Sequence, residues 1–263
     1  MSTTPSTEIA VEVKDLRMAY GKKLIQENVS FQVKKGSIFI IMGGSGCGKS
    51  TLLKLMIGLL PPADGQVLYG ETDYWAAETE EQDAIRRRFG VLFQGSALFS
   101  TLTLTENVTM PMQLNGDAKK SKAERRDRAE ELLGLVGLSH AVDLLPNEIS
   151  GGMKKRAALA RALALDPEFL FLDEPSAGLD PISSRKLDEL ILELRERTKA
   201  TVLVVTHELP SLFAIGDDGI FLDAKSKQPI ARGAPKALLE NCEDPFVQAF
   251  LNREVPDGDD ANE

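Results

Sequence analysis

The chain has 263 residues, of which 43% are hydrophobic and 27% are charged, a composition that excludes disordered, collagen-like and disulfide-stapled chains. Its 31 basic and 40 acidic residues give a formal net charge of −9, so it lacks the broad basic surface that binds nucleic-acid phosphates. We therefore expect a folded globular protein of one large or two modest domains, with no nucleic acid among its partners.

The N-terminus and the apolar runs indicate a cytoplasmic protein. The first eight residues are rich in Ser and Thr and lack the basic and apolar regions of a secretory signal. The apolar run at 38–42 is far shorter than the roughly 20 residues that cross a bilayer. The two cysteines, Cys47 and Cys242, are too few for a disulfide framework and suit a reducing compartment.

Two kinds of strand are predicted. The β-rich runs at 9–13, 29–33 and 65–69 are accompanied by turn signals and predict an antiparallel layer near the start of the chain.

Three other runs, at 38–42, 169–172 and 201–205, are short and continuously apolar, which is typical of parallel strands buried on both faces. Between the last two runs, apolar residues at 187, 190, 191 and 194 form the stripe of an amphipathic helix. A strand, a helix and a second strand in this order predict a parallel crossover.

A further amphipathic helix is predicted at 129–136, within a helical subdomain at about 95–165. The fold class is therefore α/β, with a parallel-sheet core, an antiparallel β flank and a helical subdomain. We expect one domain over 8–255, an N-terminal extension at 1–7, and an acidic, disordered tail at 256–263.

A glycine-rich loop follows the first buried strand and precedes a helix. Its residues are Gly43, Gly44, Ser45, Gly46, Cys47, Gly48, Lys49, Ser50 and Thr51, which fit the phosphate-loop pattern G-x-x-x-x-G-K-[ST]. Glycines let successive backbone N–H groups point toward phosphates, and the following helix adds its positive N-terminal end. Lys49 is expected to reach the β- and γ-phosphates of a nucleotide, and Ser50 to ligate Mg²⁺.

Cys47 lies in this loop near Lys49 and a helix N-terminus, surroundings that favour a thiolate. We expect it to react with alkylating reagents only in the absence of nucleotide; the alternative is an inert thiol that faces away from the ligand.

Two carboxylates, Asp173 and Glu174, end the apolar strand at 169–172. Acids in such a place are commonly exposed caps, but a parallel α/β sheet places its ligand site at the carboxyl edge of the strands, where the phosphate loop also lies. With that loop present, Asp173 is predicted to hold the Mg²⁺ shell, and Glu174 to orient or deprotonate the attacking water.

Four more motifs surround these two. They are Gln94 after an apolar strand, the segment Ile149-Ser150-Gly151-Gly152-Met153, the segment Ser176-Ala177-Gly178-Leu179-Asp180, and Thr206-His207 after the run at 201–205. In this order they resemble the Q-loop, signature motif, D-loop and H-loop of an ATP-binding-cassette (ABC) ATPase, over about residues 8–235.

The resemblance implies a RecA-like core that binds ATP and Mg²⁺, with Gln94 as a further metal ligand and catalytic residue. It also implies that Tyr20 stacks on adenine and that His207 contacts the γ-phosphate. In this family two cassettes pair head-to-tail, so a second copy of the chain would present Ser150, Gly151 and Gly152 to the nucleotide. Ser150 is a good N-cap for the predicted helix at 153–163, which agrees with that role.

Met153 stands where most cassettes have Gln, so the contact of that Gln is in doubt here. The sequence around it is similar to ATPases of transporters with MCE-domain partners, such as the Mla phospholipid and mammalian-cell-entry systems. This implies a peripheral protein on the cytoplasmic side of the inner membrane. The implied partners are an integral-membrane permease, an MCE-domain protein reached indirectly, and a small cytoplasmic regulatory subunit, whose presence the sequence leaves open.

Two alternatives are a cassette of another transporter class and a soluble cassette such as an iron–sulfur assembly factor. The segment at 96–112 discriminates between transporter and soluble roles, because its apolar residues exceed what one short element needs; an exposed patch there would mark a permease interface. The sequence gives neither the cargo nor the direction of transport.

Overall fold

The computed structural model describes residues 8–115 and 120–254, so the predicted extension at 1–7 and the predicted tail at 256–263 lie outside the described residues. The chain divides into two compact units. One contains the described residues up to Ala77 and from Val204 onward, and the other covers Glu78–Leu203.

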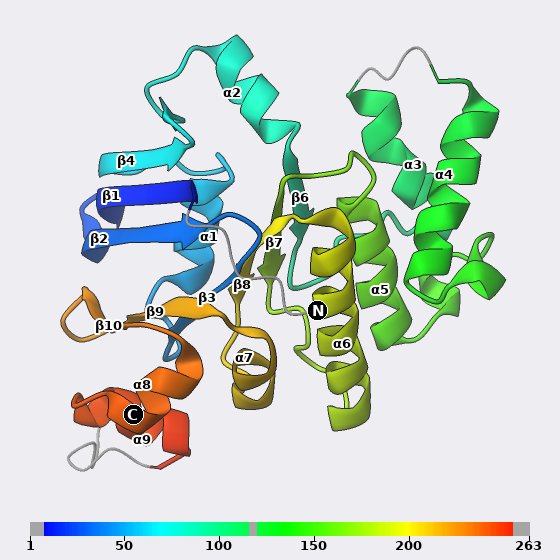
Figure 1. The fold of residues 1–263 in the computed structure, drawn as a ribbon. Coiled ribbons are helices and arrows are strands. Elements are labelled where there is room, and N and C mark those ends of the chain that lie inside the picture. The colour runs from blue at the N-terminus through cyan, green and yellow to red at the C-terminus, as the bar shows by residue number, and fades with distance from the viewer. Residues whose placement is uncertain (1–7, 116–119, 255–263) are drawn as a thin grey trace. The chain divides into compact units, whose positions relative to one another are not determined.

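The first unit contains a four-stranded antiparallel sheet in the order β2-β1-β4-β5 (Figure 1). Its strands are β1 (Ile9–Tyr20), β2 (Lys23–Lys34), β4 (Asp64–Tyr69) and β5 (Thr72–Asp73). The predicted antiparallel layer is confirmed, and β1 and β2 are longer than predicted. Bulges interrupt their pairing, and Asn28 adopts a φ of 55°. Bulges break the alternation of apolar and polar residues from which strand length is predicted.

Buried strands follow in the same unit. All six residues of β3 (Ile38–Gly43) are buried, and β3 pairs in parallel with β9 (Asp218–Leu222). β9 pairs in turn with the antiparallel β10 (Pro229–Arg232). The helices of this unit are α1 (Lys49–Met56), α7 (Leu209–Ile215), α8 (Pro235–Asn241) and α9 (Pro245–Asn252). The continuous apolar run at 38–42 therefore does mark a buried parallel strand, as predicted.

The second unit pairs β6 (Phe89–Leu92) in parallel with the wholly buried β7 (Phe169–Asp173). Its helices are α2 (Thr79–Arg86), α3 (Leu104–Leu114), α4 (Lys122–Leu135), η1 (Ser139–Ala141), η2 (Pro146–Glu148), α5 (Gly151–Ala162) and α6 (Pro181–Thr198). The division between the units falls within β8 (Thr201–Val205).

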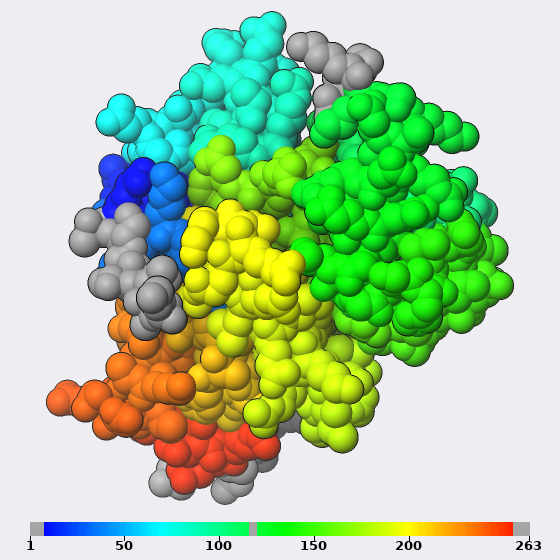
Figure 2. All heavy atoms as spheres, turned by 45° about the vertical axis from the view of Figure 1, so that its right-hand side comes forward, coloured from blue at the N-terminus to red at the C-terminus, as the bar shows by residue number. Residues whose placement is uncertain are grey.

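Helices α3, α4 and α5 pack against one another, and α3 and α4 form part of one face of the molecule in Figure 2. The predicted amphipathic helices are present. α4 buries Ala129, Leu132 and Leu133, and α6 buries Leu187 and other residues of its stripe. Within 8–115 and 120–254, no helix combines the length and the apolar character that crossing a membrane requires.

Candidate functional site

The glycine-rich loop leaves β3 and enters α1 in a conformation that requires glycine at two positions. Gly43 has a φ of 139°, and a Cβ atom there would lie 2.3 Å from the Leu222 carbonyl oxygen. Gly48, with a φ of 102°, is the N-cap of α1, and its Cβ would lie 2.7 Å from Cγ2 of Ile25. Side chains are therefore excluded from the back of the loop, which leaves the N-terminus of α1 facing outward for an anion.

Lys49, the first residue of α1, folds back over this loop. Its Nζ donates hydrogen bonds to the carbonyl oxygens of Gly43 and Gly44, each at 2.8 Å. Ser45 and Gly46 form the exposed tip of the loop. The ammonium group is thus held by the loop that is predicted to cradle phosphates, where it can pair with a phosphate oxygen.

The prediction that the surroundings of Cys47 favour a thiolate is wrong. Its side chain is 1% exposed, and burial raises the pKa of the thiol, although Lys49 opposes that rise. The Cys47 Sγ lies 3.9 Å from Lys49 Nζ. Desolvation outweighs the nearby positive charge, so the group is a buried thiol and the alternative of an inert cysteine applies.

Gln26 on β2 hydrogen-bonds to the loop, and no sequence pattern had selected it. Its fully buried Nε2 donates to the carbonyl oxygens of Cys47, at 2.9 Å, and Asp223, at 2.6 Å. These two bonds tie the loop to β2 and to the residue after β9.

In the second unit, Asp173 and Glu174 lie at the end of β7 and are 7% and 6% exposed. They are buried carboxylates rather than exposed caps. Glu174 has a φ of 49°, in the left-handed region that non-glycine residues rarely adopt. Such backbone strain is characteristic of functional sites.

Lys155 of α5 contacts the backbone of Glu174, and sequence reasoning missed it. The side chain is buried, and its Nζ donates to the Glu174 carbonyl oxygen at 3.1 Å and to the Gln94 carbonyl oxygen. Burial lowers the pKa of Lys155, whereas the nearby carboxylates of Glu174 and Asp173 raise it. A signal was present, since Lys155 shares a helical face with Ala158, Leu159 and Ala162, which are all buried.

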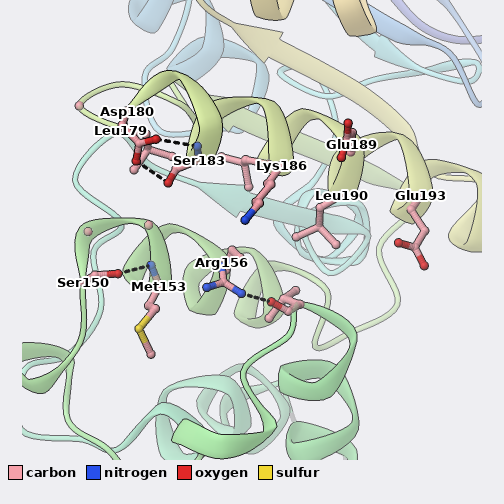
Figure 3. A pocket seen from close by; sticks show the side chains of 15 residues that line it. Ser150, Met153, Arg156, Leu179, Asp180, Ser183, Lys186, Glu189, Leu190 and Glu193 are labelled. Atoms are coloured by element: carbon pink, nitrogen blue, oxygen red, sulfur yellow. Dashed lines mark hydrogen bonds between the residues drawn. The ribbon is translucent and has the colours of Figure 1, made fainter.

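The signature segment and the D-loop border one cavity of about 640 Å³ within the second unit (Figure 3). Ser150 is the N-cap of α5, and its Oγ accepts from the Met153 N–H at 3.3 Å. Asp180 is the N-cap of α6 and accepts from the N–H groups of Ile182 and Ser183. Bonds from Ser183 lower the pKa of Asp180.

Figure 3 places Ser150 and Asp180 at the same end of this cavity. The predicted helix after Ser150 is therefore present, and its N-terminus opens onto the cavity. Gly151, Gly152 and the Met153 side chain line the same space. A hydrogen-bond acceptor that enters here can reach the first turn of α5.

The remaining predicted residues are exposed. Tyr20, at the end of β1, is 47% exposed, Gln94 follows β6, and His207 follows β8. Tyr20, the phosphate loop and His207 belong to the first unit, whereas Gln94, the signature segment and the two carboxylates belong to the second.

The predicted magnesium ligands are a hydroxyl (Ser50), an amide (Gln94) and a carboxylate (Asp173), the oxygen donors that suit Mg²⁺. Over the described ranges, three or more His, Cys, Asp or Glu side chains nowhere gather into a metal-binding group. This donor set fits an ion that takes its other ligands from water and phosphate oxygens.

Comparison with known proteins identifies the family. The ABC transporter family matches residues 26–177. The chain is 40% identical to the probable ribonucleotide transport ATP-binding protein mkl of Mycobacterium leprae, over 93% of this chain and 69% of that protein. It is 39% identical to the intermembrane phospholipid transport system ATP-binding protein MlaF of Haemophilus influenzae, over 93% of this chain and 90% of that protein.

A solved structure is similar to this chain in both fold and sequence. The ATP-binding cassette MJ0796, described as a dimer in a post-hydrolysis state with ADP and phosphate, superposes with a TM-score of 0.76. It is 33% identical, and the match covers 84% of this chain and 97% of that one. The chain belongs to the ABC transporter family as an ATP-binding cassette ATPase.

Proposed function

We propose that the chain is the motor subunit of a bacterial transporter that moves phospholipid between the inner membrane and periplasmic MCE-domain machinery. The observation that carries this proposal is the similarity to MlaF, which extends over nine-tenths of both chains. Met153, at the position where most cassettes have Gln, supports the same subfamily.

Two copies of the chain would bind ATP head-to-tail. Each phosphate loop would hold the β- and γ-phosphates through Lys49 and the N-terminus of α1, with Tyr20 against the adenine. The other copy would supply Ser150, Gly151 and Gly152 at the start of α5. The exposure of Ser150 and Gly151 beside the cavity supports this role.

Hydrolysis would use the buried end of β7. Ser50, Asp173 and Gln94 would hold Mg²⁺, which would neutralise charge on the phosphates. Glu174 would accept the proton of the attacking water, and His207 would contact the γ-phosphate. The burial of Glu174 suits this role, because it keeps the carboxylate apart from bulk water.

A permease would bind the segment that follows Gln94, and the exposed part of this segment is smaller than predicted. Leu104, Val108 and Met112 are buried within the helical packing of α3, whereas Phe99 is 50% exposed and Leu98 and Leu102 are half-buried. Asn107 holds the backbone of this segment by donating to the carbonyl oxygens of Phe99, Leu102 and Thr103. An aromatic ring on a fixed backbone suits a protein interface.

Such an interface would hold the chain on the cytoplasmic side of the inner membrane, with MCE-domain and small regulatory subunits as further partners. The alternatives are another cargo and a soluble cassette.

The test of cargo uses the chain reconstituted in liposomes with a permease that binds it. We expect ATP-dependent movement of a fluorescent phospholipid and no ATP-dependent uptake of ribonucleotide. Uptake of ribonucleotide without lipid movement would contradict the phospholipid proposal. A chain that binds no permease would favour the soluble alternative.

A further inference from the structure

Helix α5 holds the segment after β6 at two points through basic side chains. Lys155 donates to the Gln94 carbonyl oxygen, and Arg161 donates to the carbonyl oxygens of Ala97, at 2.6 Å, and Ser96, at 2.9 Å. Ser96 and Ala97 have φ values of 62° and 48°. A backbone in the left-handed region needs such outside support, so the conformation of residues 94–97 depends on α5.

The same Lys155 ammonium group reaches the catalytic end of β7. Its bond to the Glu174 carbonyl oxygen spans 3.1 Å, and Glu174 is the residue whose φ of 49° turns the chain away from the strand. The buried cation also lies near the carboxylates of Asp173 and Glu174, which offset its desolvation. One side chain therefore joins α5 to two backbone positions that carry functional side chains.

We propose that Lys155 is a positioning residue that fixes Gln94 and Glu174 relative to the signature helix. It acts through their backbone carbonyl groups. This inference rests on the proposed roles of Gln94 and Glu174, and it links the position of both residues to the position of α5.

The first turn of α5 would contact the nucleotide bound to the other copy of the chain. Lys155 lies one helical turn further along the same helix. If contact with that nucleotide shifts α5, the shift would also move Gln94 and Glu174 of the chain to which this α5 belongs. The Lys155 bonds would in this way contribute to the coupling between the two ATP sites, which the Hill coefficient for ATP reports.

The test compares Lys155→Met, which removes the donor and the charge at similar length, with Lys155→Arg, which keeps both. Lys122→Met, at an exposed position at the start of α4, controls for the loss of one lysine charge. For each full-length protein, equilibrium binding of a fluorescent ATP analogue, phosphate release at saturating ATP, and the Hill coefficient for ATP are measured.

For Lys155→Met we expect kcat to fall by about tenfold or more and the Hill coefficient to approach one, with ATP affinity within about twofold of wild type. Lys155→Arg should restore most of kcat, and Lys122→Met should match wild type. A merely structural role would lower thermal stability and ATP affinity together, without this separation.

A kcat for Lys155→Met within about twofold of wild type would overturn the inference. If Lys155→Met does not fold, Lys155→Leu also lacks a donor, and a wild-type Hill coefficient and kcat for that variant would overturn the inference. Glu174→Gln in parallel separates the two proposals: if that variant keeps wild-type turnover, the proposed role of Glu174 fails instead.

Discussion

The side chain of Gln26 donates a hydrogen bond, 2.9 Å long, to the backbone carbonyl of Cys47 in the phosphate loop. Gln26 is fully buried and donates a second bond to Asp223, so it connects the loop to the strands behind it. The loop is therefore anchored to β2 and to the residue after β9.

Replacing Gln26 with Leu should weaken ATP binding. The change leaves two buried carbonyl groups without these donors. An unsatisfied buried carbonyl costs about 1–3 kcal/mol of free energy, and part of this cost should appear as a higher dissociation constant for ATP. Isothermal titration calorimetry with ATP measures this dissociation constant. Gln32→Leu is the matched control, since Gln32 lies on the same strand but is exposed. Equal ATP affinity of the Gln26→Leu and Gln32→Leu proteins would show that this support does not matter.

Cys47 should resist alkylation whether or not ATP is present. Its raised pKa keeps the thiol protonated at neutral pH, and its burial excludes reagents. Because the pKa is raised, labelling should increase only as the pH rises well above neutrality. Cys242 is half-buried and provides an internal reference. Mass spectrometry after maleimide treatment reports both sites; faster labelling of Cys47 than Cys242, with protection by ATP, would restore the thiolate hypothesis.

Phe99→Asp should release the chain from membranes. The ring is half exposed, and its loss removes apolar area worth roughly 25 cal/mol per Å² at the proposed permease interface. Nucleotide binding by the isolated protein should not change, because the bonds between Asn107 and Phe99 involve only the Phe99 backbone, which the substitution retains. Leu59→Asp, at a residue 62% exposed outside this segment, is the control for surface charge. Membrane fractionation of cells that express each form measures this release. If the Phe99→Asp and Leu59→Asp proteins both stay with the membranes, the proposed permease interface is refuted.

The sequence was sufficient to predict the residues that follow buried strands. The apolar runs before Gly43, Asp173 and Thr206 identify strands by composition alone, and parallel strands place their carboxyl ends at one edge. The helix start at Ser150 was also predictable, since local capping chemistry determines it.

The supporting residues could not be predicted in the same way. Gln26 faces inward because a bulge near Asn28 shifts the register of β2, and alternation does not reveal such a shift. Lys155 lies in a run of basic residues that looks like a solvated face, and this run hides the signal from the apolar residues on the same side of α5. The thiolate expected at Cys47 was wrong for a similar reason, since the burial that raises its pKa depends on tertiary structure.

Steady-state phosphate release by the Glu174→Gln protein at saturating Mg-ATP tests most directly whether Glu174 is the base for hydrolysis. The amide keeps the size of the side chain but cannot take a proton from water, so turnover should fall by roughly 10²–10⁴-fold, about 3–5 kcal/mol of barrier. ATP binding and ATP-dependent dimer formation should persist. Glu168→Gln, an exposed glutamate just before the same strand, should turn over normally. A Glu174→Gln protein that releases phosphate at the wild-type rate would contradict the assignment of the base.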